Sequence, residues 1–459
     1  MYQIDFNKPV HVHFIGIGGI SMSGLAEVLL KEDFTITGSD NARSPLTIQL
    51  EEAGATVYYG QKAENIKEGI DVVVYTAAIR EDNEEFVAAK EAGLPMLTRA
   101  ELLGQLMKNY DMPIAVSGTH GKTTTTSMLS HILLAGNMDP TISVGGILKA
   151  IGGNIRVGAS EVFVTEACEY TNSFLSFFPK ISIILNVDAD HLDFFKDIDD
   201  IRNSFHMFAK LLPADGVLVI NREIDKLEEI ISGLDCKVVT FGPDTSADYS
   251  PANITHDSFG HAAFDLLKQG EFVSHIQLSV SGDHNVLNAI AAYAVADAID
   301  VPAAEIAQGL KEFTGTDRRF EYKGTFNGVT VIDDYAHHPT EIKATLKAIK
   351  NYPHKEAWCI FQPHTYTRTH ALFDDFVEAL THVDHVIIAD IYAAREKNTI
   401  GISSESIAVA LKKLGRDAIY LPDFTAIEEF CLSHCKEGDM LITMGAGNVV
   451  NIGENLING

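Results

Sequence analysis

The chain repeats one pattern: a short apolar run, a polar or glycine-rich turn, and then a stretch whose hydrophobic residues recur at helical spacing. In the N-terminal part, Leu25, Val28 and Leu29 show this spacing after the first apolar run. The runs of this part that we expect to form strands lie at residues 10–15, 34–37 and 71–76. Strands that alternate with helices favour a parallel sheet whose strands are joined by crossover helices.

The same alternation continues through the rest of the chain. A linker is expected at Asp111-Met112-Pro113, and a helix is expected to begin at about Lys122. Further strands are expected at residues 114–117, 162–165, 181–187, 217–220, 329–333, 357–361, 386–389 and 441–444. We therefore predict an α/β fold with three domains, at residues 1–110, 111–316 and 317–459. The first and the last should be Rossmann-like, and the central one should have a mostly parallel sheet.

Length and composition agree with this organisation. The chain of 459 residues is too long for one ordinary domain, and 46% hydrophobic and 21% charged residues are typical of a globular protein. The apolar runs are far shorter than the roughly 20 residues that cross a bilayer, and the N-terminus lacks the pattern of a signal peptide. We therefore expect a cytoplasmic protein without membrane insertion, whose five cysteines are reduced.

The charge of the chain narrows the choice of partners. Acidic residues outnumber basic ones by 63 to 35, which gives a formal net charge of -28. Such a surface repels nucleic acid, so no nucleic-acid partner is expected. An anionic substrate would need a local positive pocket. For the assembly we expect a monomer or a weak homodimer.

The most specific motif is SGTHGKT, at Ser117–Thr123, between an expected strand and an expected helix. It is typical of a phosphate loop, in which glycines let backbone N–H groups turn toward phosphate oxygens at a helix N-terminus. Lys122 can then bridge the β- and γ-phosphates, and the Thr123 hydroxyl can bind Mg²⁺. The loop departs from the standard pattern because Val116 stands at the first glycine position and Gly118 comes later.

A second glycine turn, GIGGIS at Gly16–Ser21, follows the first expected strand. Asp40 ends the next strand, where a ribose-binding acid stands in dinucleotide-binding proteins. An NAD-dependent dehydrogenase is therefore a rival interpretation. The turn could equally bind the diphosphate of another nucleotide, because backbone donors at a helix start do not read what lies beyond the phosphates.

Polar residues also follow other expected strands. Glu166 and Glu169 end one strand of the central part, and Asn186–His191 (NVDADH) ends another, so this sheet could hold Mg²⁺ beside the phosphate loop. In the last part, Asp333–Pro339 and Phe361–Arg368 are two polar loops that follow strands. If they share one edge of a sheet, they form the rim of a small-molecule site.

Together these motifs resemble the Mur ligase superfamily over essentially the whole chain. The resemblance rests on GIGGISMSG at Gly16–Gly24, GTHGKT at Gly118–Thr123, EACEYTNSF at Glu166–Phe174, NVDADHLD at Asn186–Asp193, HNVLN at His284–Asn288, DRRF at Asp317–Phe320, DDYAHHP at Asp333–Pro339 and FQPHTYTRT at Phe361–Thr369. It implies a UDP-binding N-terminal domain, a central P-loop ATPase-type domain and a C-terminal domain that closes over the site. The implied activity is formation of an amide bond between UDP-N-acetylmuramate and L-alanine, with ATP and Mg²⁺, through an acyl phosphate.

The resemblance also implies roles for individual residues. The UDP-substrate would be bound by Gly16, Gly18, Gly19, Ser21 and Asp40. ATP would be bound by Gly118, Thr119, His120, Gly121, Lys122, Thr123, Thr124, Asn285, Asn288, Arg319 and Asp334. L-alanine would be bound by Tyr335, His364 and Arg368, and two Mg²⁺ ions by Thr123, Glu166 and His191. The implied catalytic residues are Lys122, Glu166, His191 and Arg319.

Three other functions stay open. A nicotinamide oxidoreductase would bind NAD(H) at Gly16–Ser21 but leaves the loop at Lys122 unexplained. A non-catalytic nucleotide switch would keep that loop but has no need for an amino-acid pocket. A related ligase that attaches a recycled peptide to UDP-N-acetylmuramate would share nearly every motif.

Overall fold

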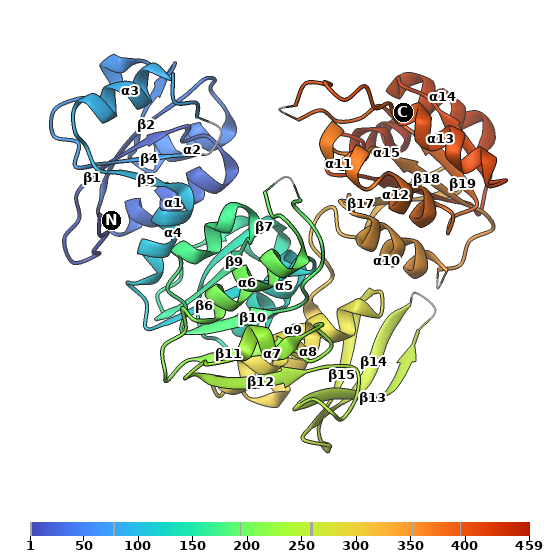
Figure 1. Cartoon of the computed structure of the whole chain (residues 1–459), viewed down its shortest axis with the longest axis horizontal. Helices are drawn as coiled ribbons and strands as arrows, with labels where there is room; N and C mark the ends of the chain where they lie inside the picture. Colours follow the sequence, from blue (N-terminus) through green and yellow to red (C-terminus); the bar gives the residue numbers. More distant parts are fainter. Residues whose placement is uncertain (1, 77–78, 193, 258–259, 351, 395) are drawn as a thin grey trace. The chain divides into compact units, whose positions relative to one another are not determined.

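The computed structural model describes residues 2–76, 79–192, 194–257, 260–350, 352–394 and 396–459. In these residues the strands form three sheets, of five, ten and six strands (Figure 1). The chain divides into two compact units. One consists of Met1–Ser250, Leu267–Glu271 and Ile290–Gly309, and the other of Pro251–Leu266, Phe272–Ala289 and Leu310–Gly459.

The N-terminal sheet is parallel, as predicted, with the strand order β3-β2-β1-β4-β5. Its strands are β1 (His11–Ile15), β2 (Thr35–Asp40), β3 (Thr56–Tyr59), β4 (Val72–Tyr75) and β5 (Met96–Thr98). The helices that connect and follow them are α1 (Ile20–Lys31), α2 (Pro45–Glu52), η1 (Ala63–Asn65), α3 (Glu84–Glu91) and α4 (Arg99–Met107). Because the strand order turns around at β1, the glycine turn after β1 lies at the position where such sheets bind ligands.

The central sheet has the order β15-β14-β13-β12-β11-β10-β6-β9-β7-β8. Its strands are β6 (Met112–Ser117), β7 (Thr141–Leu148), β8 (Gly153–Arg156), β9 (Val162–Ala167), β10 (Ile181–Ile184), β11 (Val217–Asn221), β12 (Lys237–Phe241), β13 (Tyr249–His256), β14 (His261–Lys268) and β15 (Glu271–Ser281). Strands β6, β9, β10 and β11 were predicted, and they pair in parallel. Strand β8 pairs with β7 in the antiparallel sense, so the sheet is mixed.

Several helices belong to this central part of the chain. They are α5 (Lys122–Ala135), η2 (Lys149–Ile151), η3 (Tyr170–Ser176), α6 (Ile198–Ala209), α7 (Leu227–Ile231), α8 (His284–Ala298) and α9 (Ala303–Glu312). The predicted linker at Asp111-Met112-Pro113 is wrong for its last two residues, because Met112 and Pro113 begin β6 and pair with β9. Proline is tolerated there because it lies at the start of the strand.

The C-terminal sheet has the order β16-β17-β21-β18-β19-β20, with only its edge strand β16 antiparallel in the described pairs. The strands are β16 (Glu321–Phe326), β17 (Val329–Asp334), β18 (Ala357–Phe361), β19 (His385–Ile388), β20 (Asp417–Tyr420) and β21 (Met440–Met444). The helices are α10 (Pro339–Ile349), α11 (Tyr366–Ala371), α12 (Phe373–Leu380), α13 (Ser404–Lys413), α14 (Phe424–His434) and α15 (Val450–Asn458).

Both faces of this C-terminal sheet are covered by helices. Ile332 and Cys359 face one core, with residues of α10, α12 and α13. Their neighbours Val331 and Trp358 face a second core, with residues of α14 and α15. Alternating positions along each strand thus enter different cores, as in a doubly wound fold. The α/β fold class predicted from the sequence is confirmed.

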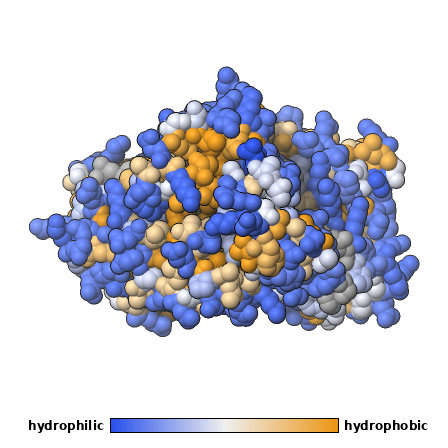
Figure 2. Space-filling view, turned by 90° about the horizontal axis from the view of Figure 1, so that it is seen from below, coloured by the Kyte–Doolittle hydropathy of each residue, from blue (hydrophilic) through white to orange (hydrophobic). Residues whose placement is uncertain are grey.

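On the face drawn in Figure 2, hydrophilic residues predominate and hydrophobic residues gather in a few patches. No helix in the part of the chain that the structure describes is long and apolar enough to cross a membrane. All five cysteines are free thiols, as predicted.

Helix α4 joins the N-terminal sheet to the central one through a close backbone contact. It packs against η3, and Leu103 and Leu106 enter one core with Phe163 of β9 and Phe174 of η3. A Cβ atom on Gly104 would lie 1.9 Å from the carbonyl oxygen of Ser176, so only glycine allows this approach.

We predict that Gly104→Ala destabilises this unit, because the added methyl group must push α4 away from η3. An overpacked core site typically costs about 1 to 3 kcal/mol. The measurement is the midpoint of the first thermal unfolding transition. Gly153→Ala is the matched control, since its Cβ would meet nothing within 4 Å. Equal midpoints for the two variants would contradict the packing described here.

Candidate active site

The loop at Ser117–Thr123 has the backbone that a phosphate loop requires. Gly118 has a φ of +141°, and a Cβ atom there would lie 2.8 Å from the Cβ of Leu185. Gly121 has a φ of +84° and is the N-cap of α5. Both positions therefore need glycine, and the loop passes directly into the positive end of a helix dipole. Thr124 follows in the first turn of α5.

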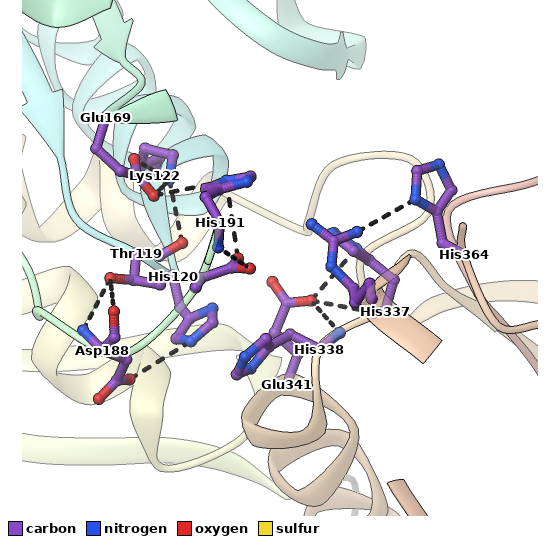
Figure 3. A network of polar contacts seen from close by, with 12 residues as sticks. Thr119, His120, Lys122, Glu169, Asp188, His191, His337, His338, Glu341 and His364 are labelled. Carbon is purple, nitrogen blue, oxygen red and sulfur yellow. Dashed lines mark hydrogen bonds and ion pairs between the residues drawn. The ribbon is translucent and has the colours of Figure 1, made fainter. Parts of the chain in front are cut away.

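Residues after β10 fix the shape of this loop. The Asn186 side chain accepts a hydrogen bond from the His120 amide at 2.7 Å and donates one to the His120 carbonyl at 3.0 Å. The Asp188 amide donates to the Thr119 hydroxyl at 2.9 Å, and its carboxylate lies 3.4 Å from Nε2 of His120 (Figure 3). The polar cluster predicted from NVDADH thus positions the phosphate loop. Asp193, the last residue of the longer motif NVDADHLD, lies outside the described residues.

Lys122 is paired with a buried carboxylate. Its ammonium donates to Oε2 of Glu169 at 3.0 Å and to the carbonyl of Thr119 at 3.0 Å (Figure 3). The Glu169 side chain is only 2% exposed. Burial disfavours the charged ammonium most strongly, but the charges of Glu169, Cys168 and Glu166 and the hydrogen bond to Glu169 together outweigh it, so the pKa of Lys122 is raised. Lys122 is therefore a fixed cation at neutral pH.

The predicted Mg²⁺ ligands Thr123 and Glu166 lie together. The Thr123 hydroxyl donates to Oε2 of Glu166 at 3.0 Å, and the Gly145 amide donates to Oε1 at 2.6 Å. Within the described residues, no group of three or more His, Cys, Asp or Glu side chains is placed to hold a metal. Mg²⁺ usually takes one or two protein oxygens and fills its shell with water and substrate phosphates. One hydroxyl and one carboxylate beside a phosphate loop fit that requirement.

His191 lies near the carboxylates of Glu169 and Asp190. Its Nε2 is 4.0 Å from Oε1 of Glu169 and 3.8 Å from Oδ2 of Asp190. Its ring stacks on Tyr170, with centroids 4.4 Å apart. The side chains of Lys122, Glu169 and His191 thus converge beside the phosphate loop (Figure 3).

Asp40, which the sequence groups with the N-terminal glycine turn, is hydrogen-bonded to that turn. The Gly18 amide donates to Oδ2 of Asp40 at 2.8 Å, and the Gly16 amide donates to the Ser39 carbonyl at 2.8 Å. Gly19 is the N-cap of α1, and Ser21 lies in its first turn. A Cβ atom on Gly18 would lie 2.8 Å from the Asp40 carboxylate. The turn therefore presents the start of α1, as a diphosphate site would.

In the second unit, Asp334 fixes the loop that carries several predicted residues. Its carboxylate accepts hydrogen bonds from the Ala336 amide at 2.7 Å and the Phe320 amide at 2.9 Å. Burial raises the pKa of Asp334 to about 6, although Arg319 opposes that shift. Arg319 lies 3.7 Å from Glu341 and 5.3 Å from the centroid of the Tyr335 ring.

The predicted amino-acid residues His364 and Arg368 contact each other. Nη1 of Arg368 lies 3.2 Å from Nδ1 of His364, whose ring stacks on Tyr392 and lies 5.8 Å from that of His337. Burial lowers the pKa of His364, and the Arg368 charge lowers it further, so the ring is neutral at pH 7. Tyr335 is on the neighbouring loop and contacts His337 edge to face.

Asn285 and Asn288 are buried in the first turns of α8. The Asn285 amide donates to the Ser281 carbonyl at 2.7 Å, and the Asn288 amide donates to Asn285 at 3.0 Å. The predicted residues thus form two groups. The glycine turn, phosphate loop, Glu166 and His191 belong to the first unit, while the asparagines, Arg319, Asp334 and the amino-acid residues belong to the second.

Sequence reasoning missed several partners of these residues. In the DRRF motif, it is Arg318 rather than Arg319 that pairs with the buried carboxylate of Asp333, at 3.0 Å. Glu341 could have been found, because a glutamate shortly after Pro339 signals a capping box. Glu396 accepts hydrogen bonds from the Tyr366 and Thr367 amides at the start of α11, and no local pattern points to it.

Comparison with known families agrees with the motifs and the fold. A model described as "Mur ligase family, catalytic domain" matches residues 11–111, one described as "Mur ligase middle domain" matches residues 116–296, and one described as "Mur ligase, glutamate ligase domain" matches residues 318–447. The chain therefore belongs to the Mur ligase family, which confirms the resemblance seen in its motifs.

Within the family, the chain is similar to ligases of one specificity. It is 60% identical to UDP-N-acetylmuramate--L-alanine ligase of Agathobacter rectalis and 57% identical to that of Lachnoclostridium phytofermentans, in both cases over 100% of either chain. The solved structure of UDP-N-acetylmuramate-alanine ligase from Thermotoga maritima matches 98% of both chains with a TM-score of 0.81 and 28% identity. A murein peptide ligase from Psychrobacter arcticus also matches 98% of both chains, with a TM-score of 0.71 and 26% identity.

We predict that Lys122 and Glu169 are energetically coupled, and a double-mutant cycle measures this. Lys122→Met and Glu169→Gln should each lower the free energy of unfolding by roughly 3 to 5 kcal/mol, because each leaves one buried charge unpaired. The double variant should lose less than the sum of the two. The same cycle at the exposed pair Arg43 and Glu51, 3.2 Å apart, is the control and should show little coupling. Additive losses at Lys122 and Glu169 would contradict the pairing.

Proposed function

We propose that this chain is an ATP-dependent ligase that forms the amide bond between UDP-N-acetylmuramate and L-alanine. The observation that carries this proposal is the match, over the full length of both chains, to ligases with this name at 60% and 57% identity. The paired Lys122 at the start of α5 supports the use of a nucleoside triphosphate. The proposed domain boundaries are residues 1–110 for the UDP-substrate, 111–316 for ATP and 317–459 for the amino acid.

The proposed reaction has two steps. A carboxylate oxygen of UDP-N-acetylmuramate attacks the γ-phosphorus of ATP, the bond to the bridging oxygen breaks, and ADP leaves an acyl phosphate behind. The amine of L-alanine then attacks the acyl carbon, loses a proton and displaces inorganic phosphate. No side chain of the enzyme becomes a nucleophile in this scheme. The chain has to orient the reactants and stabilise the charge on the transferring phosphoryl group.

The residues around the phosphate loop suit these tasks. Lys122 is a preorganised cation that can exchange Glu169 for phosphate oxygens as the nucleotide binds. Bound Mg²⁺ would neutralise phosphate charge, and we propose Thr123 and Glu166 as ligands of one ion and His191 as a ligand of a second. Arg319, Asp334, Asn285 and Asn288 are proposed as further nucleotide-binding residues. In the N-terminal domain, Gly16, Gly18, Gly19, Ser21 and Asp40 are proposed to bind the UDP-substrate.

L-alanine is proposed to bind at Tyr335, His364 and Arg368. A guanidinium is well suited to a small carboxylate because it can donate two parallel hydrogen bonds. The neighbouring His364 has a lowered pKa, so it adds no competing positive charge at neutral pH. A cytoplasmic location and a monomeric or weakly dimeric state stay predictions from the sequence.

The substrate preference can be measured directly. In an assay of ADP release with UDP-N-acetylmuramate and ATP, we expect L-alanine to give a higher kcat/KM than glycine, L-serine or a tripeptide. A preference for the tripeptide would instead assign the chain to the peptide ligases, of which one structure matches it with a TM-score of 0.71. Saturable NADH binding with hydride transfer would reject the ligase proposal altogether.

Arg368→Ala should chiefly raise the KM for L-alanine, because it removes the guanidinium proposed to bind the substrate carboxylate. Loss of a charged hydrogen bond in a partly buried site typically costs about 2 to 4 kcal/mol. Steady-state kinetics at varied L-alanine and fixed ATP provide the measurement. Arg416→Ala, at an exposed arginine of the same domain, is the control and should leave the KM unchanged. If Arg368→Ala raised only the KM for ATP, that loop would belong to the nucleotide site.

A further inference from the structure

The arginines of the N-terminal domain differ in one respect that concerns an anionic substrate. Arg43 and Arg80 lie 3.2 Å and 3.1 Å from a carboxylate, in pairs with Glu51 and Asp82. Among the residues that the structure describes, no carboxylate lies within ion-pair distance of Arg99. In a chain with a net charge of -28, such an uncommitted guanidinium is a rare source of local positive charge.

Arg99 is placed between the glycine turn and the end of β9. It is the first residue of α4, whose start is fixed by a capping box between Thr98 and Glu101. Its Nη1 donates to the hydroxyl of Ser21, in the first turn of α1, at 3.5 Å. The contact of Gly104 with Ser176, described above, fixes the same helix against η3.

The Arg99 side chain is partly buried. Burial lowers the pKa of Arg99, and Cys168 and Glu166 at the end of β9 act in the opposite direction. The guanidinium is thus partly desolvated, and the charges of Cys168 and Glu166 act on it. A partly desolvated cation without an ion-pair partner is costly, and an anionic ligand would remove that cost.

We propose that Arg99 is a substrate-binding residue whose guanidinium binds an oxyanion of the sugar nucleotide, between the glycine turn and the phosphate loop. This rests on the proposed function, which supplies the sugar nucleotide as substrate. Two groups of UDP-N-acetylmuramate have the required chemistry, the diphosphate and the lactyl carboxylate, and a guanidinium can bind either through two parallel hydrogen bonds. The start of α1 beside Ser21 would bind the same anion from the other side.

The test is calorimetric titration with UDP-N-acetylmuramate, without ATP, of the full-length wild type and its variants. Arg99→Ala should raise the Kd roughly 10- to 100-fold, and Arg99→Lys should raise it less because the charge is kept. Lys108→Ala is the matched control. Lys108 is the C-cap of the same helix, with its ammonium over the Phe178 ring, and its loss should leave the Kd unchanged.

A second titration, with UDP-N-acetylglucosamine, identifies the anion, because this compound has the diphosphate but lacks the lactyl carboxylate. Equal weakening of both sugar nucleotides by Arg99→Ala would identify the diphosphate, and weakening of UDP-N-acetylmuramate alone would identify the carboxylate. Titration with a non-hydrolysable ATP analogue checks that the variant is folded, and its Kd should not change.

Three outcomes would overturn the proposal. An unchanged Kd for UDP-N-acetylmuramate in Arg99→Ala would show that the side chain does not bind the substrate. Equal loss of sugar-nucleotide and ATP-analogue binding would show a structural role for Arg99. A wild type that binds neither sugar nucleotide would reject the proposed function itself, and the inference about Arg99 with it.

Discussion

The pair of the partly buried Lys122 ammonium with the buried Glu169 carboxylate imposes the main constraint on the first unit. A cation under a phosphate loop must be neutralised when no phosphate is present, because an unpaired charge at this depth would destabilise the fold. Glu169 neutralises it at 3.0 Å, and the carbonyl of Thr119 accepts a second hydrogen bond. The carboxylate therefore occupies the electrostatic position that a phosphate would take. Under the proposed function, nucleotide binding at this loop would exchange one anion for another, rather than fill an empty positive site.

The order of the central sheet brings the remaining groups to this cation. Strands β10, β6 and β9 are neighbours and run in parallel, so the segments that follow them begin at one edge of the sheet. The phosphate loop follows β6, Glu166 and Glu169 follow or end β9, and Asn186 follows β10. The phosphate loop, the acidic groups and the Asn186 amide that fixes the loop thus come from three separate stretches of sequence.

In the C-terminal sheet, β21 separates β17 from β18. The loop after β21 accepts hydrogen bonds from Arg318 at the carbonyls of Gly445 and Gly447.

Hydrophobic periodicity was sufficient to predict most of the parallel strands, because strands buried on both faces are continuous apolar runs. It failed where tertiary contacts override the local pattern. Strand β10 ends at Ile184, before the expected end at Val187, because the carbonyl and the side chain of Asn186 accept hydrogen bonds from the phosphate loop. The glycine and lysine positions of the site could be predicted because phosphate binding dictates their local conformation. The pairing of Glu169 with Lys122, and that of Glu396 with the amides at the start of α11, could not be predicted. Sequence spacing does not report which side chains meet in space.

The contact between Gly104 and Ser176 has a mechanical consequence. Most helix packing passes through side chains, whose rotamers can change and let two elements slide by a small amount. Here the main chains themselves touch, and a Cβ atom would lie 1.9 Å from the Ser176 carbonyl oxygen, so no rotamer change can absorb a shift. Any sliding of α4 over η3 would have to break this junction. Helix α4 is therefore held in register with η3 by its main chain, and side-chain repacking alone cannot release it.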